Sequence, residues 1–287
     1  MQSVVRSAFA KVNLGLDVIK RRPDGYHEVS MIMQSIGLCD KVTISKNGGK
    51  SINFGTDSCV LNSESSDTNL CVKAAKLMQD TFGTDGVDIY LEKHIPIAAG
   101  LAGGSTDAAA VMHGMNELFG IGASEEKLRE LGVTLGADIP YCIMGGTALS
   151  EGIGEKLMQI PSKVDFDMVL VKPNFPVPTG AVYKGLVLDE NTKHPNISWL
   201  LASLVCGDTD NALGAMSNLL ETVTSALHPE ITQIEKSLEA NGAVKAIMSG
   251  SGPTVFGLFD GEEKALIACQ ELKKMYPEYE IFCTKFN

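Results

Sequence analysis

Short apolar stretches rich in β-branched residues open the chain, and a helical period follows them. Strands are predicted for SVVRSAFA, VNLGLDVIK, HEVSMIMQSI and KVTIS, interrupted by the turn signals PDG at 23–25 and NGG at 47–49. From residue 69 to residue 82 the apolar side chains recur at the spacing of one helix face, and VDIYLEK predicts the next strand. These elements indicate a mixed structure of strands and helices.

A segment rich in glycine and alanine, IPIAAGLAGGST, comes next and leads directly into a second helical pattern. We expect this helix over residues 106–119, with Ser105 as its cap and Gly120 at its end. Ser124 is then expected to cap a helix that stops near Gly136, because Glu125 and Glu126 suit the first turn of a helix. YCIMGGTALSE predicts a strand bent at its paired glycines.

The second half of the chain begins with a strand, FDMVLVKP, and a helix that Pro178-Thr179 opens. More helical segments lead to the strands VKAIMS and TVFGLF, a helix over residues 262–275 and the strand YEIFCTK. This order of elements is that of the split βαβ, or ferredoxin-like, plan. The short link QIPSK contains a proline, so we expect two domains, 1–160 and 161–287.

Composition and charge narrow the possible partners. The 287 residues are 44% hydrophobic and 21% charged, which is ordinary for a globular protein. The net charge of −11 argues against broad binding to nucleic acid or to an anionic membrane. A small anion remains possible, because a local group of lysines and backbone amides can outweigh the distant field.

The cysteines and the N-terminus indicate a reducing compartment. Seven cysteines are scattered without a CxxC pair, which favours reduced thiols over a disulfide framework or a metal site. The N-terminal stretch has no signal-peptide pattern, and no apolar run reaches the roughly 18 residues of a membrane span. We therefore expect a cytoplasmic protein without a membrane partner.

The small residues before the helix at 106 suit an anion. Backbone N–H groups and the helix dipole attract a phosphate, and small side chains let it approach closely. The alternative is a tight turn that only packs a helix on a sheet. The segment is longer than such a turn requires, so phosphate binding is favoured. It is neither a GxxxxGK[ST] nor a GxGxxG loop.

Three segments resemble motifs of the GHMP small-molecule kinase superfamily: SAFAKVNLGLDV, PIAAGLAGGSTDAAA and SGSGPTVFGLF. They occur in the order and spacing of that family. The resemblance implies an α+β, two-domain GHMP kinase fold, with a ribosomal protein S5 domain 2-like N-terminal domain and a ferredoxin-like C-terminal domain. Ala102 replaces a usual glycine and Thr106 a usual serine. A methyl group at 102 is tolerable only if that residue keeps a negative φ and its Cβ faces away from the phosphates, so we expect this conformation.

The resemblance also implies the catalytic residues. It assigns the proton acceptor to Asp138 and a partnering lysine to Lys11. A nearby lysine keeps an aspartate ionised, and it also stabilises negative charge on the transferring group. Without the family, Lys11 would be taken for a solvent-facing strand lysine and Asp138 for a turn residue.

AFAKVNLGLDVIKRRPDGYHEVSMIMQSI is similar to the members of the family that act on a cytidyl diphosphate of methylerythritol. This similarity implies Tyr26 and Tyr183 on the two faces of the cytosine and His27 on its polar edge. The alternatives are a turn pair that covers the core and a buried helix face around Tyr183. Thr179 and Asn13 are further substrate-binding candidates.

ATP and Mg²⁺ are the cofactors that the resemblance implies. No protein ligand for the metal is obvious from the sequence, and Ser105 and Thr106 are no more than candidates. We expect a monomer or a homodimer with a small-molecule substrate and no nucleic acid. The candidate ATP-binding residues are Asn69, Lys93, Pro96, Ile97, Ala98, Ala99, Gly100, Leu101, Ala102, Gly103, Gly104, Ser105 and Thr106.

Two other functions fit the same motifs. A GHMP kinase for mevalonate, homoserine or a sugar would share them, but PDGYHE favours a substrate that carries a base. A non-catalytic nucleotide-binding protein on the same scaffold would have no use for both Lys11 and Asp138.

Overall fold

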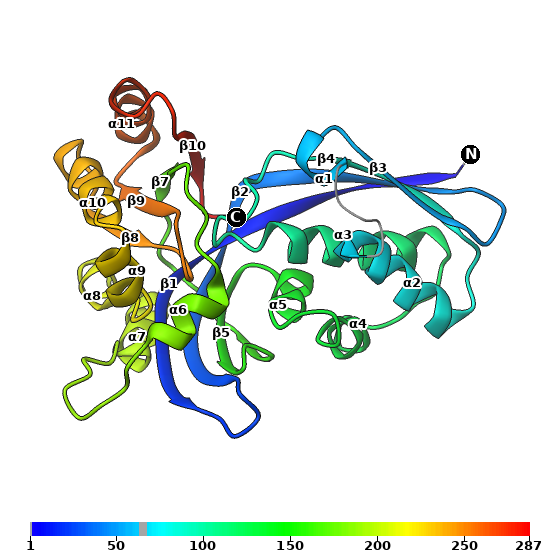
Figure 1. Ribbon diagram of the computed structural model, residues 1–287, viewed down its shortest axis with the longest axis horizontal. Helices are drawn as coiled ribbons and strands as arrows, with labels where there is room; N and C mark the ends of the chain where they lie inside the picture. The colour runs from blue at the N-terminus through cyan, green and yellow to red at the C-terminus, as the bar shows by residue number, and fades with distance from the viewer. Residues whose placement is uncertain (1, 63–67) are drawn as a thin grey trace. The chain divides into compact units, whose positions relative to one another are not determined.

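The structure is a computed structural model that describes residues 2–62 and 68–287, and its chain packs into two compact units (Figure 1). The strands predicted separately at the N-terminus join into β1 (Ser3–Arg21) and β2 (His27–Lys46), and each strand contributes to both units. The domain limits 1–160 and 161–287 therefore stay a prediction. The first unit comprises Met1–Ala10, Leu38–Ile97 and Ala102–Gly145, and the second comprises Lys11–Gly37, Ala98–Leu101 and Gly146–Asn287.

In the first unit, helices pack on strands in the order β3-β4-β2. β3 (Ile52–Thr56) runs parallel to β4 (Val87–Glu92), and β4 runs antiparallel to β2. The predicted helix at 69–82 is α2 (Leu70–Phe82), which Asn69 caps by accepting the Cys71 N–H at 2.8 Å. The apolar faces of α2 and α3 (Gly103–Leu118) share one core with β2 and β4.

The start of α3 differs from the prediction. The helix begins at Gly103 rather than at 106, and Ala102 occupies the N-cap position without a side-chain cap bond. The expectation of a negative φ at Ala102 was wrong: its φ is 57°. The Ala102 carbonyl accepts the Thr106 N–H at 2.9 Å, which is the first hydrogen bond of the helix. The left-handed conformation of Ala102 therefore directs the backbone into α3. Ser105 lies inside the first turn and does not cap it.

The segment after α3 also differs in part. Ser124 caps α4 (Glu125–Gly132) as predicted, by accepting the Lys127 N–H at 3.1 Å. The predicted bent strand YCIMGGTALSE was wrong in its first part, because Ile139–Met144 forms α5. Pro140 suits the first turn of a helix, and this local signal overrides the apolar run. The strand β5 (Thr147–Gly152) begins only after the two glycines.

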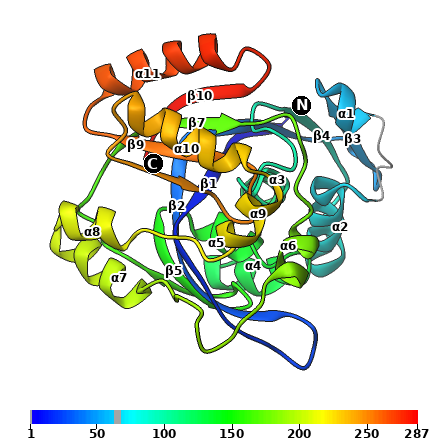
Figure 2. The same cartoon turned by 60° about the vertical axis from the view of Figure 1, so that its left-hand side comes forward.

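The second unit confirms the predicted element order. Its four-stranded sheet has the order β10-β7-β9-β8, and every neighbouring pair is antiparallel. α10 and α11 cover one face of this sheet, as Figure 2 shows, and their apolar residues share a core with the strands. These elements are β7 (Asp167–Lys172), β8 (Lys245–Met248), β9 (Val255–Phe259), β10 (Glu280–Lys285), α10 (Glu230–Ala240) and α11 (Glu262–Met275).

The remaining elements are short. Within the second unit β2 also pairs with β5, which pairs in turn with β6. Among the described residues, no helix has the length and apolarity needed to cross a membrane. The elements are α1 (Cys59–Asn62), β6 (Lys156–Gln159), α6 (Thr179–Gly185), α7 (Ile197–Cys206), α8 (Thr209–Ala215) and α9 (Glu221–Leu227).

Candidate active site

Lys11 is a buried lysine on β1, and only 5% of it is exposed. Its Nζ donates a hydrogen bond of 2.7 Å to Oδ1 of Asn13, which is fully buried. Lys11 and Asn13 are two positions apart on a strand, so their side chains leave it on the same face. No carboxylate of the described chain forms an ion pair with Lys11. A buried cation without a counterion is costly, so this environment suits an anionic ligand.

The glycine-rich motifs lie next to Lys11 within the second unit. The backbone N–H of Lys11 donates to the Leu101 carbonyl at 3.2 Å. A Cβ on Gly250 would lie 3.6 Å from Nζ of Lys11 and 3.4 Å from Oδ1 of Asn13. Ser249 donates through Oγ to the Gly100 carbonyl at 3.0 Å. The first, second and third motifs are thus brought together around one ammonium group.

The backbone of the glycine-rich loop turns back and forth. Ala98, Gly100 and Ala102 have φ values of 53°, 76° and 57°, and the residues between them have no such positive φ. Alternation of this kind points successive N–H groups toward one side, which is how a backbone nest binds an anion. Alanine in this conformation costs about 1–3 kcal/mol, a strain that proteins usually retain at functional sites.

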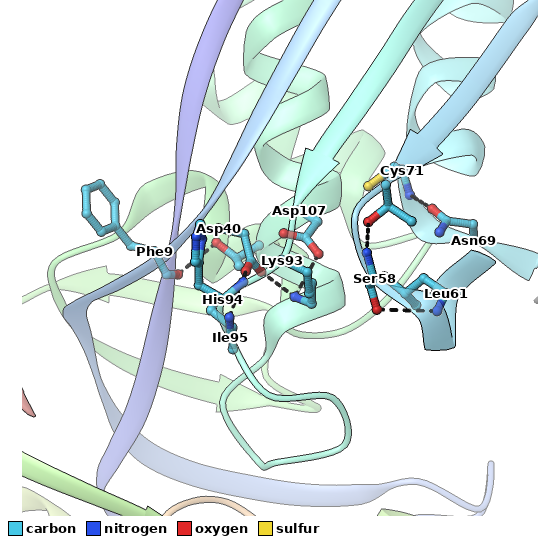
Figure 3. Close-up of polar contacts among 12 residues, drawn as sticks. Phe9, Asp40, Ser58, Leu61, Asn69, Cys71, Lys93, His94, Ile95 and Asp107 are labelled. Atoms are coloured by element: carbon cyan, nitrogen blue, oxygen red, sulfur yellow. Dashed lines mark hydrogen bonds and ion pairs between the residues drawn. The ribbon is translucent and has the colours of Figure 1, made fainter. Parts of the chain in front are cut away.

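In the first unit, a buried ion cluster lies where the loop begins (Figure 3). Nζ of Lys93 pairs with Oδ2 of Asp40 and, at 3.1 Å, with Oδ2 of Asp107. The other Asp40 oxygen accepts the N–H groups of His94 and Ile95 at 2.5 and 2.7 Å. Asp40 therefore ties Lys93 to the backbone that leads into the loop.

Burial and neighbouring charges shift the pKa values of this cluster. Burial raises the pKa of Asp107 well above its usual range, and the neighbouring Asp40 carboxylate raises it further. Burial opposes the charge on Lys93, but the two carboxylates raise its pKa above the ordinary value. Oδ1 of Asp107 is buried without a hydrogen-bond partner in the described chain.

Asp40 and Asp107 were not predicted as site residues from the sequence. The signals that could have found them are a charged residue inside a strand, at Asp40, and the aspartate of STDAAA, at Asp107.

The predicted adenine contacts, Asn69 and Lys93, both have structural roles here. Lys93 is held by its two carboxylates, and a Cβ on Gly103 would lie 2.9 Å from its Nζ. Asn69 uses its Oδ1 as the cap of α2. Their contact with adenine stays a prediction.

Asp138 occupies the N-cap position of α5 but does not cap the helix. Its φ and ψ are −81° and −16°, and its side chain makes no cap hydrogen bond. Aspartate at this position usually accepts a backbone N–H from the first turn. The half-buried carboxylate of Asp138 has no hydrogen bond or ion pair with the described residues. It is therefore available to a substrate, and its role as a base stays a prediction.

The two hydroxyls at the start of α3 differ in availability. Oγ1 of Thr106 donates to the Phe9 carbonyl at 2.8 Å, and Thr106 is only 3% exposed. Ser105 is half-buried and makes no hydrogen bond through its hydroxyl to the described chain. Of the two candidate ligands for a phosphate or Mg²⁺, Ser105 is the one whose hydroxyl is not already engaged.

The predicted base-binding residues are only partly brought together. The rings of His27 and Tyr183 lie 5.0 Å apart between centroids and are tilted by 33°, whereas Tyr26 is 59% exposed. Burial and the positive charge of Arg21 lower the pKa of His27, which keeps its imidazole neutral near pH 7. Thr179, four residues before Tyr183 on α6, lies 2.9 Å from the Ser251 hydroxyl.

Comparison with known proteins agrees with these motifs. Family profiles described as "GHMP kinases N terminal domain" and "GHMP kinases C terminal" match residues 69–146 and 200–278. The chain is 48% identical over 287 residues to a protein of Lachnoclostridium phytofermentans named 4-diphosphocytidyl-2-C-methyl-D-erythritol kinase, with 100% of this chain and 98% of that protein covered.

Solved structures show the same fold. A crystal structure of 4-(cytidine 5'-diphospho)-2C-methyl-D-erythritol kinase matches with a TM-score of 0.83 and 31% identity, covering 99% of each chain. A homoserine kinase from Cytophaga hutchinsonii matches with a TM-score of 0.82 over 100% of this chain and 95% of that one, but at 20% identity this likeness shows the fold alone. The fold predicted from the three motifs is confirmed.

Proposed function

Since the chain belongs to the GHMP kinase family, we propose that it phosphorylates 4-diphosphocytidyl-2-C-methyl-D-erythritol at its 2-hydroxyl with ATP. The reaction would serve the non-mevalonate, methylerythritol phosphate route to isoprenoid precursors, in the cytoplasm. Full-length relatives and a solved structure of that name support the choice of substrate. The observation that carries the proposal is the buried ammonium of Lys11, which lies beside glycine-rich backbone and has no carboxylate partner among the described residues.

In this proposal the loop and Lys11 receive the triphosphate of ATP. Phosphoryl transfer requires charge stabilisation and alignment more than covalent chemistry. The N–H groups around the positive-φ residues of the loop, 98–102, would hold phosphate oxygens. Lys11 would stabilise the negative charge of the transferring group, because its ammonium has no competing carboxylate among the described residues.

Asp138 would accept the proton of the substrate hydroxyl. A general base must present a carboxylate that is not already bonded, and Asp138 does so at the start of α5. The hydroxyl oxygen would then attack the γ-phosphorus, with ADP as the leaving group. Asn13 would hold Lys11 in position through its 2.7 Å hydrogen bond.

Mg²⁺ fits this site as a companion of the nucleotide. No group of three or more His, Cys, Asp or Glu side chains in the described chain is placed to hold a metal. Mg²⁺ in kinases is bound largely by substrate phosphates and water, with few protein ligands. Ser105 is the residue that would contact it, and the ion would neutralise phosphate oxygens.

His27, Tyr183 and Tyr26 would recognise the cytosine. A neutral imidazole offers one donor and one acceptor, which suits the polar edge of a pyrimidine. The exposed ring of Tyr26 is free to close over a base, and each stacked ring contributes about 1–3 kcal/mol. Thr179 lies on the same side of α6 as Tyr183 and would contact the substrate.

An ADP-release assay tests this function against its rivals. The purified protein is given ATP and Mg²⁺ with the cytidyl substrate, mevalonate or homoserine in separate reactions. We expect turnover with the cytidyl substrate alone. Turnover with mevalonate or homoserine would identify another member of the family, and binding of ATP without turnover on any alcohol would indicate a non-catalytic protein.

The oligomeric state is tested separately. Analytical ultracentrifugation of the same sample distinguishes a monomer from a homodimer.

A further inference from the structure

Two glutamates outside the candidate active site form a carboxyl pair in the second unit. Glu221 begins α9 and Glu235 lies in α10, and their side chains are hydrogen-bonded to each other. Both residues are half-buried. Oε1 of Glu235 is buried and accepts no hydrogen bond from the described residues. Two carboxyl groups can be hydrogen-bonded to each other only when one of them carries a proton, because an ionised carboxyl group has no donor.

The pair is attached to the third glycine-rich motif through the backbone. Oε2 of Glu221 accepts the Met248 N–H at 2.9 Å, at the end of β8. Asn218 donates through Nδ2 to two carbonyls of the segment 248–251, both at 2.8 Å. Thr224 donates to a further carbonyl of that segment at 3.1 Å. Asn218, Glu221 and Thr224, which are spaced three residues apart, thus bind the main chain of segment 248–251 through hydrogen bonds.

The segment 248–251 borders the residues that would bind phosphate. Ser249 donates to the Gly100 carbonyl, and a Cβ added at Gly250 would lie in van der Waals contact with Lys11 and Asn13. A Cβ on Gly100 would lie 2.4 Å from the Ser249 carbonyl oxygen, so the backbones of loop 98–101 and segment 248–251 are in close contact. A shift of segment 248–251 would therefore displace Lys11 and the backbone of loop 98–101.

We propose that Glu221 and Glu235 share one proton and that this pair holds segment 248–251 against the phosphate-binding loop. Both glutamates are then positioning residues for phosphoryl transfer. This inference rests on the proposed kinase function for its effect on catalysis, but the pair itself can be tested without any substrate.

The charges around the pair explain which glutamate holds the proton. Burial raises the pKa of both carboxyls, and for Glu235 burial together with the Glu221 charge raises it to about 8. The Met248 N–H opposes this rise at Glu221, so Glu221 is the ionised partner. Glu239 on α10 adds to the rise at Glu235, and Lys245 on β8 opposes it.

The other elements that pack on α10 add no charge to this balance. β9 has the sequence VFGLF and no titratable side chain. Tyr276, at the end of α11, is bonded to Ser237 of α10 through its hydroxyl. Below about pH 8 Glu221 and Glu235 share the proton. Above about pH 8 both carboxyl groups are ionised and repel each other, which weakens the hydrogen bond from the Met248 N–H to Glu221.

Activity profiles against pH test the effect on catalysis. The wild type is compared with Glu235→Gln, whose amide donates to Glu221 at every pH, and with Glu263→Gln, an exposed glutamate of α11, as the matched control. We expect the KM for ATP of the wild type and of Glu263→Gln to rise by about fivefold or more between pH 7 and 9. Glu235→Gln should stay flat. Superimposable profiles for all three proteins would overturn the proposal.

Thermal unfolding tests the pair independently of activity. Between the ordinary glutamate pKa of 4.5 and about 8, folded Glu235 keeps a proton that the unfolded chain loses. Stability therefore falls as pH rises through this window and levels off above it. The fall in Tm should be smaller in Glu235→Gln than in the wild type and in Glu263→Gln. Equal falls would show that no proton is shared, even if the protein proved not to be a kinase.

Glu221→Ala removes the hold on Met248 altogether. We expect a raised KM for ATP at every pH, without the alkaline increase of the wild type. Glu221→Gln retains an acceptor for the Met248 N–H and serves if the alanine variant does not fold. It should have a flat profile like that of Glu235→Gln, and an alkaline rise equal to that of the wild type would contradict the pairing.

Discussion

At the scale of single residues, the site is built from polar groups whose partners are missing or already taken. Among the described residues, the ammonium of Lys11 is bonded to Asn13 and to no carboxylate, and the side chain of Asp138 makes no cap hydrogen bond, so each is available to a ligand. Thr106 is already bonded to Phe9 and is not available. The motifs predict Lys11 and Asp138 as catalytic residues, and these roles stay predictions. The engagement of Thr106 depends on a strand about a hundred residues away and was not readable from the chain.

Asp138→Asn tests the general base. Asparagine keeps the size of the side chain but cannot accept the hydroxyl proton, so kcat should fall by about 10²-fold or more with little change in KM. Asp260→Asn, which alters a carboxylate whose side chain is 83% exposed, is the control and should keep its activity. Turnover near that of the wild type would remove Asp138 from this role.

Tyr26→Ala tests the recognition of the base. Loss of a stacked ring should raise the KM for the cytidyl substrate by about 5- to 150-fold and leave the KM for ATP unchanged. Tyr26→Phe keeps the ring and should retain the wild-type KM. If both variants behave alike, the cytosine does not lie on Tyr26.

At the scale of elements, sequence periodicity predicted most helices and strands but not the breaks between them. α2, α4 and the C-terminal sheet were expected from spacing and caps. α5 was missed, because six apolar and aromatic residues suit a strand as well as a helix, and only Pro140 favours the helix. The start of α3 was misplaced because Ala102 adopts a left-handed conformation that glycine usually provides.

Gly103→Val tests whether the loop holds phosphate. A Cβ at this position would meet Nζ of Lys93 at 2.9 Å, so valine must displace the cluster or the loop. Calorimetry should show weaker ATP binding, by about tenfold or more. Gly214→Val on α8, where a Cβ has open space, is the control and should bind ATP normally. Unchanged affinity in Gly103→Val would mean that phosphate binds elsewhere.

At the scale of the whole molecule, a chain with a net charge of −11 keeps two buried lysines in very different settings. Lys93 is neutralised by Asp40 and Asp107 and so contributes to stability, whereas Lys11 has no such partner in the described chain. The motifs predict a functional role for both lysines, but they do not reveal the carboxylates of Asp40 and Asp107 that Lys93 contacts in the fold. The three-dimensional contacts distinguish a lysine that is paired with carboxylates from one that has no such pair among the described residues.

Asp40→Asn tests the structural role of the ion cluster. Removing one partner of a buried pair leaves Lys93 undercompensated, so the free energy of unfolding should fall by about 3–5 kcal/mol in urea. Glu92→Gln breaks the exposed pair with Lys41 and should change it by about 0–1 kcal/mol. Equal effects of the two substitutions would show that the cluster does not stabilise the fold.

In the proposed reaction, the buried ammonium of Lys11 stabilises the γ-phosphate while it is transferred to a cytidyl alcohol. The most direct test follows radiolabelled γ-phosphate from ATP into the product, with the wild type and with Lys11→Met, which keeps the length of the side chain without its charge. We expect label on the 2-hydroxyl with the wild type, and at least about a 10²-fold lower rate in a folded Lys11→Met protein. Transfer at the wild-type rate by Lys11→Met, or no transfer by the wild type, would contradict it.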